Sequence, residues 1–368
     1  MREVGCASTP TPVSGAFPGY QPGAPAQVRG RFPGFRAPPS DGGGTVGDVR
    51  AAWYDTQGPS SVLQVGELPD PEPGEGEVRV RVTRSGINPG DVKKRTGEYS
   101  GMAYPRVVPH SDGVGVIDAV GPGADAARIG RRVWVHGAQS YRQLGTAAEY
   151  VVVPEPLAVD LPDGVSDDLG AALGIPGITA HRAVFGDGPV SGSTVLVHGV
   201  RGAVSSLAAQ LAAWGGATVI GTVRTATSAA VRGVSSLVAL DDDPAAAVLR
   251  LAPGGVDRIV EVALDANADL DAAVIRNLGV IAAYATHDDR PGLPFWPMLF
   301  QNTTIRLLGS DDFPEAAKAQ AAADLSAAAA AGALEAPVAA VLPLDRIAEA
   351  HDAVMDPAVH GRVLLSID

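Results

Sequence analysis

Alternation of apolar and polar positions divides the chain from residue 48 onward into stretches of different texture. From Val49 to about residue 154, short valine-rich runs are separated by clusters of glycine, proline and aspartate, which is typical of a small, mostly antiparallel β domain. From Ser166 an alanine-rich helix follows, and then apolar strands alternate with helices. This order predicts a doubly wound parallel sheet. Its predicted strands and helices are 194–198, 203–214, 217–223, 226–233, 236–240, 243–252, 257–262, 267–277 and 279–285.

The last part of the chain is expected to return to the first domain. The segments expected to do so are the runs TTIRLLGS, PVAAVLPL and GRVLLSI, an alanine-rich helix at 314–332 and a helix at 345–355. Alanine is the strongest helix former and Gly332 supplies a helix stop, so the alanine run at 327–331 is interpreted as plain helix. The predicted domains are a tail at 1–47, a first domain at 48–174 completed by 312–368, and a second domain at 175–311.

The N-terminal segment has the composition of a disordered tail. Residues 1–44 hold nine glycines and eight prolines and show no regular apolar period. Such a segment cannot bury enough apolar surface to offset the entropy of ordering the chain. We therefore predict that residues 1–47 are disordered and serve either as a docking arm or as an extension without a role.

Composition and charge narrow the function classes. The chain has 368 residues, of which 46% are hydrophobic and 19% charged, as is typical of a soluble globular enzyme. The formal net charge of −13 argues against nucleic acid as a main partner. No apolar stretch has the length of a membrane span and no signal-peptide pattern is present, so we expect no membrane partner and a cytoplasmic protein. The one cysteine, Cys6, excludes an internal disulfide and a multi-cysteine zinc site.

Residues 195–225, VLVHGVRGAVSSLAAQLAAWGGATVIGTVRT, carry the strongest local motif. Gly199 permits a tight turn, Gly202 lets the backbone approach a pyrophosphate, and a helix beginning near Ala203 directs its free amides at that anion. Ser205 stands where a third glycine usually serves helix-to-strand packing, and a side chain this small is expected to preserve the site. The predicted phosphate-binding residues are Gly199, Arg201, Gly202, Ala203 and Val204.

The end of the second strand predicts which dinucleotide binds. An NAD site usually ends this strand with an acid that hydrogen-bonds the ribose 2′-hydroxyl, whereas TVIGTVRT contains none. Arg224 can form paired hydrogen bonds with phosphate oxygens, and Thr222 and Thr225 can add hydroxyl contacts. We therefore predict NADPH over NADH, with a solvated surface arginine as the alternative for Arg224. Arg201 either reaches a phosphate or lies on the surface.

Several motifs together resemble one enzyme family. They are GINPGDVKKRTGEY, PHSDGVGVIDAVGPGA, RIGRRVWV, GTAAEYVVVP, the HGVRGAVSS loop and the C-terminal HGRVLLSI. From about residue 49 to 368 the chain resembles the zinc-free quinone oxidoreductases of the medium-chain dehydrogenase/reductase superfamily, the group that includes zeta-crystallin. The resemblance implies an α/β fold with a GroES-like β-rich catalytic domain and a doubly wound Rossmann domain that binds NADPH. It also implies a homodimer formed by extending the Rossmann sheet edge to edge.

The positions that bind catalytic zinc in related alcohol dehydrogenases hold other residues here. The resemblance places those ligands at Asn88 and Ser111, and neither is a credible zinc ligand in this context. His110 sits one residue early and Asp112 follows, but two residues do not make a closed site. We therefore expect no metal.

Without zinc, reduction of a quinone or of the C=C bond of an α,β-unsaturated carbonyl is favoured over alcohol oxidation. The oxygen that gains charge then needs only hydrogen-bond donors and a proton. The resemblance places Asn88 and Tyr99 in the substrate cleft near the nicotinamide. Where relatives often carry a tyrosine the chain has Lys93, which either stabilises charge or points to solvent. Tyr99 and water are equal candidates for the proton donor.

Further residues are placed by the resemblance with less support. Thr179, Tyr284 and Ala285 are expected close to the nicotinamide ring, and His136 and Tyr141 are weaker cleft candidates. His181 is interpreted as structural, and His351 and His360 as surface or domain-interface residues. The segment 294–302 is either substrate wall and dimer contact or ordinary core.

The predicted function is therefore an NADPH-dependent, zinc-independent oxidoreductase for a small-molecule quinone or enone. Two alternatives stay open. The same hydride transfer would serve a reductive cyclase or enoyl reductase of a bacterial biosynthetic pathway, and a protein that binds NADPH with little catalysis is the other reading.

Overall fold

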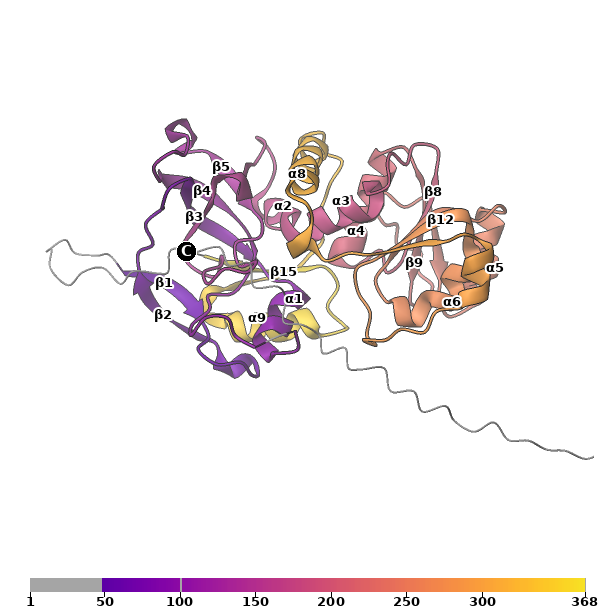
Figure 1. Ribbon diagram of the computed structural model, residues 1–368, viewed down its shortest axis with the longest axis horizontal. Helices are drawn as coiled ribbons and strands as arrows, with labels where there is room; N and C mark the ends of the chain where they lie inside the picture. Colours follow the sequence, from indigo (N-terminus) through magenta and orange to yellow (C-terminus); the bar gives the residue numbers. More distant parts are fainter. Residues whose placement is uncertain (1–47, 100, 368) are drawn as a thin grey trace, which may run out of the picture. The chain divides into compact units, whose positions relative to one another are not determined.

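The computed structural model describes residues 48–99 and 101–367, so the predicted tail at 1–47, with Cys6, lies outside the described residues (Figure 1). The β-rich part is built around β3, which pairs with β4, β6 and β15. Its sheet runs in the order β14-β15-β3-β4-β5-β7. The two strands β14 and β15 come from the C-terminal end of the chain, as the apolar runs there predict. The strands are β3 (Glu77–Gly86), β4 (Asp112–Val120), β5 (Arg132–Val135), β6 (Tyr150–Pro154), β7 (Ala158–Asp160), β14 (Val338–Pro343) and β15 (Arg362–Ser366).

Smaller elements flank this sheet. β1 (Asp48–Trp53) and β2 (Gln64–Pro69) form an antiparallel pair, and helix α1 (Pro89–Thr96) contacts helix α9 (Ile347–Met355). The interpretation of His351 as a surface or interface residue is wrong, because His351 is fully buried on the inner face of α9 with Ile347 and Ala350. These residues stand three and four positions apart, which places them on one side of a helix. The short 3-10 helices are Ser60–Val62, Ala126–Arg128, Glu155–Leu157, Ser310–Asp312 and Leu344–Arg346.

The second sheet is the predicted parallel one. Its six strands run in the order β10-β9-β8-β11-β12-β13 and every neighbouring pair is parallel, so the chain starts in the middle and winds outward twice. Val195 and Val197 pack into one core and Leu196 into another, because successive side chains of a strand face opposite sides. The strands are β8 (Thr194–Val197), β9 (Thr218–Val223), β10 (Ser236–Ala239), β11 (Val256–Glu261), β12 (Ile275–Ala283) and β13 (Thr304–Leu307).

Helices cover both faces of the parallel sheet (Figure 1). On one face α4 packs on β8 and β9 and against α3, which in turn contacts α8. On the other face α5 and α6 pack against β10, β11 and β12. Within the described part of the chain, no helix is both long and apolar enough to cross a membrane. The helices are α2 (Asp167–Gly170), the π-helical turn Leu173–Gly177, α3 (Ile178–Phe185), α4 (Ala203–Trp214), α5 (Pro244–Leu251), α6 (Leu264–Val274), α7 (Phe295–Phe300) and α8 (Glu315–Ala330).

Some predicted elements differ from the structure. TTIRLLGS, expected to return to the first domain, forms β13 of the second sheet, and the helix and strand predicted at 267–277 and 279–285 meet at Val274 and Ile275. Residues 226–233 contain no helix, because the Thr227 hydroxyl accepts the Ala229 N–H and offers the backbone a local alternative to helical bonding. Helix α6 begins at Leu264, three residues before the predicted start, since the Glu261 carboxylate accepts the Ala263 N–H and a bond from Asn267 in its first turns.

Candidate functional site

The glycine loop after β8 forms an open cradle. Gly199 has φ 61°, a left-handed conformation that favours glycine, and a Cβ at this position would lie 3.3 Å from Val262 Cγ1. Gly202 is exposed, donates to Gly199 O at 2.8 Å, and is the N-cap of α4. Among the described residues no side chain caps that helix, so the Ala203 and Val204 amides are open to an anion. The structure thus brings Gly199, Arg201, Gly202, Ala203 and Val204 together in one loop and helix start.

Ser205 has a partner that a glycine would lack. Its Oγ lies 2.8 Å from the hydroxyl of Tyr284, directly after β12, and Ser205 is fully buried. Burial raises the pKa of Tyr284 despite the Ser205 bond, so the phenol stays protonated at neutral pH. The serine therefore ties the first turn of α4 to the end of β12 at the rim of the cradle, and Ala285 follows on the exposed surface.

The three residues predicted to read the 2′-phosphate lie in different environments. Thr222 is fully buried, and its Oγ1 accepts the Gly199 N–H at 3.1 Å, so its hydroxyl holds the loop from within. Arg224 and Thr225 are exposed beyond β9, and Arg224 Nη2 donates to Pro357 O at 2.8 Å. Arg201 Nη2 donates to Thr227 Oγ1 at 3.1 Å. Among the described residues neither arginine forms an ion pair with a carboxylate, so both charges are available to an anion.

Asn88 belongs to a buried, charged network in the β-rich part. Its Oδ1 accepts a 2.6 Å bond from Arg362 Nη1, and its Nδ2 donates to Asp112 Oδ2 at 2.8 Å. Arg362 Nη2 also donates to Asp112 Oδ2 at 2.6 Å, and the Ile175 N–H donates to Asp112 Oδ1 at 2.7 Å. Ile175 lies in the π-helical turn that packs on α4, so the network connects Asn88 to the helix of the cradle.

Two glycines make room for this network. A Cβ on Gly86 would lie 2.5 Å from Arg362 Nη2, and one on Gly174 would lie 2.1 Å from Asp112 Oδ1. Both distances are too short for any side chain, so these positions require glycine for space. The Asn88 backbone N–H is held as well, by a 2.7 Å bond to Asp91. The Asn88 amide is therefore fixed in orientation, with one Nδ2 hydrogen not used by Asp112.

Tyr99 and Lys93 lie together at the far end of α1. Tyr99 is 61% exposed, and Lys93 Nζ stands 5.7 Å from the centre of its ring. Lys93 also lies 3.9 Å from Glu98. Partial burial, followed by the charge of Glu98, raises the pKa of Tyr99.

The positions corresponding to zinc ligands do not fit a zinc ion. The Asn88 amide is engaged as described, and Ser111 is a buried hydroxyl. His110 Nδ1 lies 2.8 Å from Ser85 Oγ and its Nε2 lies 2.9 Å from His351 Nε2, so both ring nitrogens have partners. The described residues contain one group of three ligand-type side chains close enough to share an ion, and it lies under the cradle instead: His198, Glu261 and Asp271.

The remaining predicted residues are spread over the structure. Thr179 is buried at the start of α3, and His181 is bonded to Asp324 at 2.8 Å. His136 is buried, and burial lowers its pKa to about 4. Tyr141 is exposed and donates to Asp312 at 2.7 Å. The segment 294–302 is not core, because its aromatic side chains Phe295, Trp296 and Phe300 are exposed.

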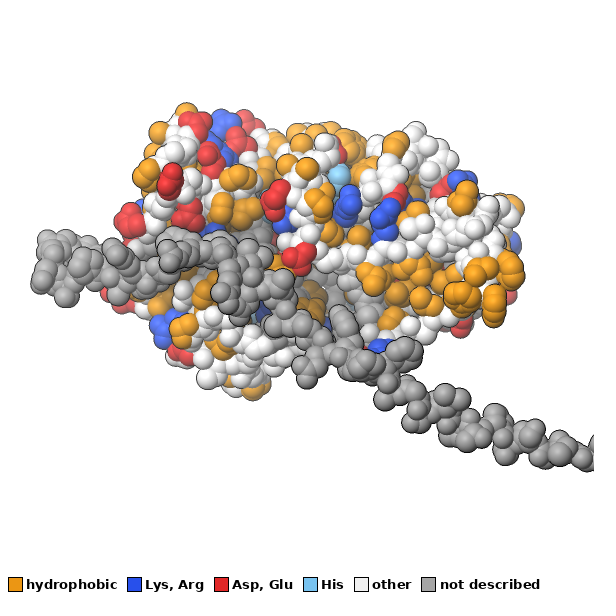
Figure 2. Space-filling view, in the orientation of Figure 1, with side chains coloured by type: hydrophobic (Ala, Val, Ile, Leu, Met, Phe, Trp, Pro, Cys, Tyr) orange, Lys and Arg blue, Asp and Glu red, His pale blue; other side chains and the backbone are white. Residues whose placement is uncertain are grey.

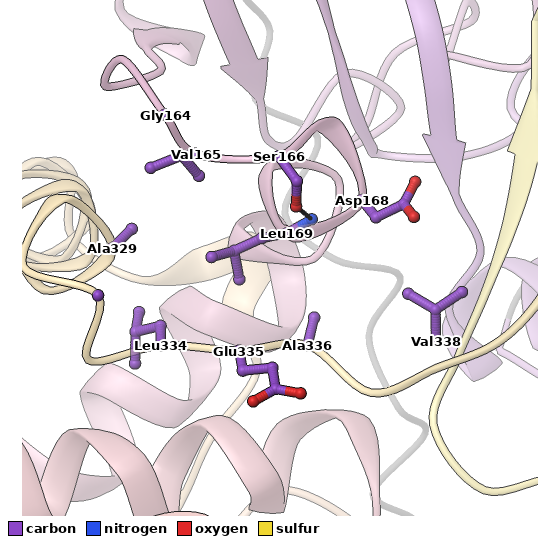
Figure 3. Close-up of a pocket in the computed structure, with 11 residues that line it drawn as sticks. Gly164, Val165, Ser166, Asp168, Leu169, Ala329, Leu334, Glu335, Ala336 and Val338 are labelled. Atoms are coloured by element: carbon purple, nitrogen blue, oxygen red, sulfur yellow. Dashed lines mark hydrogen bonds between the residues drawn. The ribbon is translucent and has the colours of Figure 1, made fainter.

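Two cavities among the described residues lie away from the cradle. One, of about 450 Å³, is lined by the turn before α2 and the segment after α8, with apolar side chains such as Leu169 and Leu334 on its walls (Figure 3). Its acids are held elsewhere: Asp168 pairs with Arg84 and Glu335 with Arg232. The other, of about 440 Å³, lies beside His181. Neither cavity contains a residue predicted for the cofactor.

Sequence reasoning missed three functional candidates, Arg362, His198 and Asp271, and it considered Asp112 only as a possible metal ligand. Arg362 and His198 stood inside motifs that were recognised for their neighbours, HGRVLLSI and HGVRG. The available signal was a charged or ionisable residue within an apolar strand end, which needs a partner when buried. The sequence does not show which partner that is.

Comparison with known proteins agrees with this architecture. The model of the alcohol dehydrogenase GroES-like domain matches residues 74–163, and the model named zinc-binding dehydrogenase matches residues 233–365. Quinone oxidoreductases of Homo sapiens and Pongo abelii are each 28% identical over 314 residues, which covers 84% of this chain and 93% of each relative.

Solved structures give the same result. A crystal structure of an NAD-dependent alcohol dehydrogenase is 29% identical with a TM-score of 0.78, and the match covers 87% of this chain and 100% of that one. A mycobacterial protein complexed with NADPH is 25% identical with a TM-score of 0.74 and the same coverage of 87% and 100%. With the GroES-like sheet, the six-stranded Rossmann sheet and relatives that match nearly end to end, the chain belongs to the medium-chain dehydrogenase/reductase superfamily of oxidoreductases, on its quinone-oxidoreductase-like branch.

Proposed function

We propose that the protein is an NADPH-dependent reductase that delivers hydride to a quinone or to the C=C bond of an α,β-unsaturated carbonyl without a metal. The observation that carries the proposal is the start of α4, which no side chain of the described part of the chain caps. Beside it stand Arg201 and Arg224, which have no carboxylate partner there, and β9 ends in no acid. A dinucleotide with an extra phosphate suits this arrangement of charges. Relatives named quinone oxidoreductases support the substrate class.

The residues present fit NADPH. The amides of Ala203 and Val204 would hold the pyrophosphate, Gly202 would let the backbone approach it, and Arg224 with Thr225 would contact the 2′-phosphate. Arg201 would add a second positive charge, while Thr222 acts from beneath the loop. When bound, the cofactor supplies the hydride.

The chain's own residues then have to stabilise an oxygen that gains negative charge. The Asn88 amide keeps one N–H beyond its bond to Asp112, and its orientation is fixed by Arg362, so it is the first candidate donor to that oxygen. Lys93 adds positive charge beside Tyr99, and Tyr99 or water delivers the proton. The donor set around Asn88 does not fit a zinc ion, so no step is assigned to one.

Arg224→Ala tests the cofactor assignment. Loss of a charged hydrogen bond to phosphate is expected to weaken NADPH binding about tenfold to a hundredfold, while NADH binding changes little. Calorimetric titration of both nucleotides measures the ratio of their affinities. Arg250→Ala, which removes an exposed arginine on α5, is the matched control. An unchanged ratio in Arg224→Ala would refute the assignment.

Turnover is tested with NADPH-saturated protein and a panel of quinones and enones, followed by loss of NADPH absorbance. Oxidation that depends on the acceptor supports the reductase. Tight NADPH binding without oxidation across the panel would favour a binding protein with little catalysis. A cyclised product from a suitable enone would favour the biosynthetic alternative, which uses the same hydride step.

The outer face of β13 supports a homodimer. β13 is an edge strand of the parallel sheet, and Leu307 on it and Phe300 on the adjacent α7 are 76% and 74% exposed. Figure 2 shows hydrophobic side chains gathered at the end of the molecule that carries α5 and α6. An open edge beside exposed aromatic groups is a surface that association would cover. Phe300→Glu is expected to shift the sedimentation coefficient from dimer to monomer, whereas Ile129→Glu, at an exposed position of the β-rich part, is not.

A further inference from the structure

A buried ionisable cluster lies directly under the dinucleotide loop. We name His198, Glu261 and Asp271 the His198 cluster; they come from the residue after β8, the last residue of β11 and the middle of α6. The His198 side chain is 1% exposed and both carboxylates are 0% exposed. His198 is also the residue immediately before Gly199, so the cluster and the loop share a backbone.

Two carboxylates in this cluster face one imidazole. His198 Nε2 lies 2.9 Å from Asp271 Oδ1 and 3.5 Å from Glu261 Oε2. Within the described residues, Asp271 Oδ2 and Glu261 Oε2 are buried without a hydrogen-bond partner. Buried carboxylate oxygens are costly unless positive charge or hydrogen bonds compensate them. The excess negative charge therefore has to be met by a proton or by a metal ion.

The contacts favour a proton. Glu261 Oε1 already accepts from the Ala263 N–H and from Asn267 Nδ2, so it caps α6 and is not free to bind an ion. The burial of all three side chains leaves no solvent to complete a metal coordination shell. Burial by itself lowers the pKa of His198, but the bond to Asp271 and the charges of Asp271 and Glu261 outweigh burial and raise it. For the Glu261 carboxyl, by contrast, burial raises the pKa.

The charge reaches the loop through Thr222. His198 Nδ1 lies 3.1 Å from Thr222 Oγ1, and the same oxygen accepts the Gly199 N–H at 3.1 Å. A charged imidazole donates from both nitrogens, to Asp271 and to Thr222, which leaves Thr222 Oγ1 as the double acceptor between His198 and Gly199. The Gly199 amide is thereby directed inward, so that the loop presents its later amides outward.

We propose that His198, held in its charged form by Asp271 and Glu261, is a positioning residue for dinucleotide binding that acts through Thr222 on the Gly199 amide. The inference rests on the proposed function only in taking NADPH as the ligand of the loop. The groups that face His198 are Asp271 from α6, Glu261 from β11 and Thr222 from β9, and Tyr284 after β12 stands near Glu261. Loss of the imidazole proton removes the donor to Thr222, so NADPH affinity falls as the pH rises.

Calorimetric titration with NADPH on the full chain tests the proposal. His198→Gln and Thr222→Val are each expected to weaken NADPH binding about tenfold. Thr222→Ser, which restores the hydroxyl, recovers most of the affinity lost in Thr222→Val. His181→Gln removes another His–Asp pair, of 2.8 Å, on α3 outside the loop, and its NADPH affinity is expected to match that of the unmodified protein. The unmodified protein loses affinity between neutral and alkaline pH, and Thr222→Val does not.

Hydrogen exchange of the peptide spanning 195–204, measured without nucleotide, gives a second readout. Faster exchange is expected in His198→Gln and Thr222→Val. If the unmodified protein binds no NADPH, the proposed function fails, and the exchange measurement still decides the positioning role. Unchanged affinity and unchanged exchange in folded His198→Gln would overturn the proposal. One equivalent of tightly bound metal, whose removal weakens NADPH binding, would overturn the proton in favour of an ion.

Discussion

The ion pair between Arg362 and Asp112 provides the sharpest test of the first domain. Asp112 is 0% and Arg362 2% exposed, and they are joined by a 2.6 Å bond. Asp112→Asn keeps the shape but leaves the guanidinium buried without its counter-charge. Breaking a buried pair from one side costs about 3–5 kcal/mol. For a chain of this size we expect the melting temperature to fall on the order of 10 °C.

The converse variant is expected to cost less. In Arg362→Met the remaining carboxyl can bind a proton and lose its charge, and burial already raises the pKa of Asp112 despite the arginine beside it. The double variant Asp112→Leu with Arg362→Met replaces the pair by apolar groups, and such replacements are often neutral in stability. We therefore expect the double variant to be more stable than Asp112→Asn.

Activity separates stability from positioning. The double variant no longer holds the Asn88 amide, so we expect its NADPH-dependent turnover to stay low while its NADPH affinity is near normal. Chemical unfolding and steady-state assays on the same preparations measure both quantities. If the stability effects of Asp112→Leu alone and Arg362→Met alone add up to that of the double variant, with no coupling between positions 112 and 362, the network does not exist in solution. If the double variant regains full turnover, Arg362 does not position Asn88.

Three further predictions follow from buried contacts. Tyr284→Phe leaves the Ser205 hydroxyl buried without its 2.8 Å partner and should lower the free energy of unfolding by about 1–2 kcal/mol, as measured by urea titration. Adding Ser205→Gly to Tyr284→Phe should recover part of that loss. Gly174→Ala should cost more than about 3 kcal/mol, because its Cβ would meet Asp112 at 2.1 Å, whereas Gly90→Ala meets nothing within 4 Å and should unfold like the parent. Burial lowers the pKa of His351 to about 3 and that of His136 to about 4, so between these values and about pH 6.5 the folded state binds fewer protons than the unfolded chain. The stability that these two residues contribute is therefore fully present above about pH 6.5 and decreases as the pH falls. A melting temperature that stays constant between pH 7 and 5 would contradict this prediction.

The sequence predicted the second sheet well because its information is local. Each strand is a short apolar run and most helices carry their own start and stop residues, so the alternation predicts a doubly wound parallel sheet. The helix expected at 226–233 failed for an equally local reason, the side-chain bond of Thr227 to its own backbone. The start of α6 was misplaced because its cap, Glu261, belongs to the preceding strand.

The candidate site likewise contains features that are local in sequence and contacts that are not. The loop at Gly199 and the missing acid after β9 are neighbours in sequence and were recognised there. Arg362 contacts Asn88 and Asp112 across 274 and 250 residues, and no periodicity links such distant positions. The partner of Ser205 lies 79 residues away, so the sequence shows a departure from the glycine pattern but not its reason.

In both the β-rich part and the parallel-sheet part, a buried charged group contacts the residue that positions an amide in the proposed site. Arg362 donates to the Asn88 side chain, and His198 contacts Thr222 Oγ1, which accepts the Gly199 N–H. Apolar packing would be at least as stable as either charged group, because burial of a charge is repaid only by near-ideal partners. Stability therefore does not account for these charged groups. We interpret them as orienting groups, because a charged donor with several fixed acceptors holds the amide that it contacts in one orientation. The proposed site presents N–H groups to an anion and to an oxygen that gains negative charge. Such donors stabilise the charge best when they are already oriented before the ligand binds.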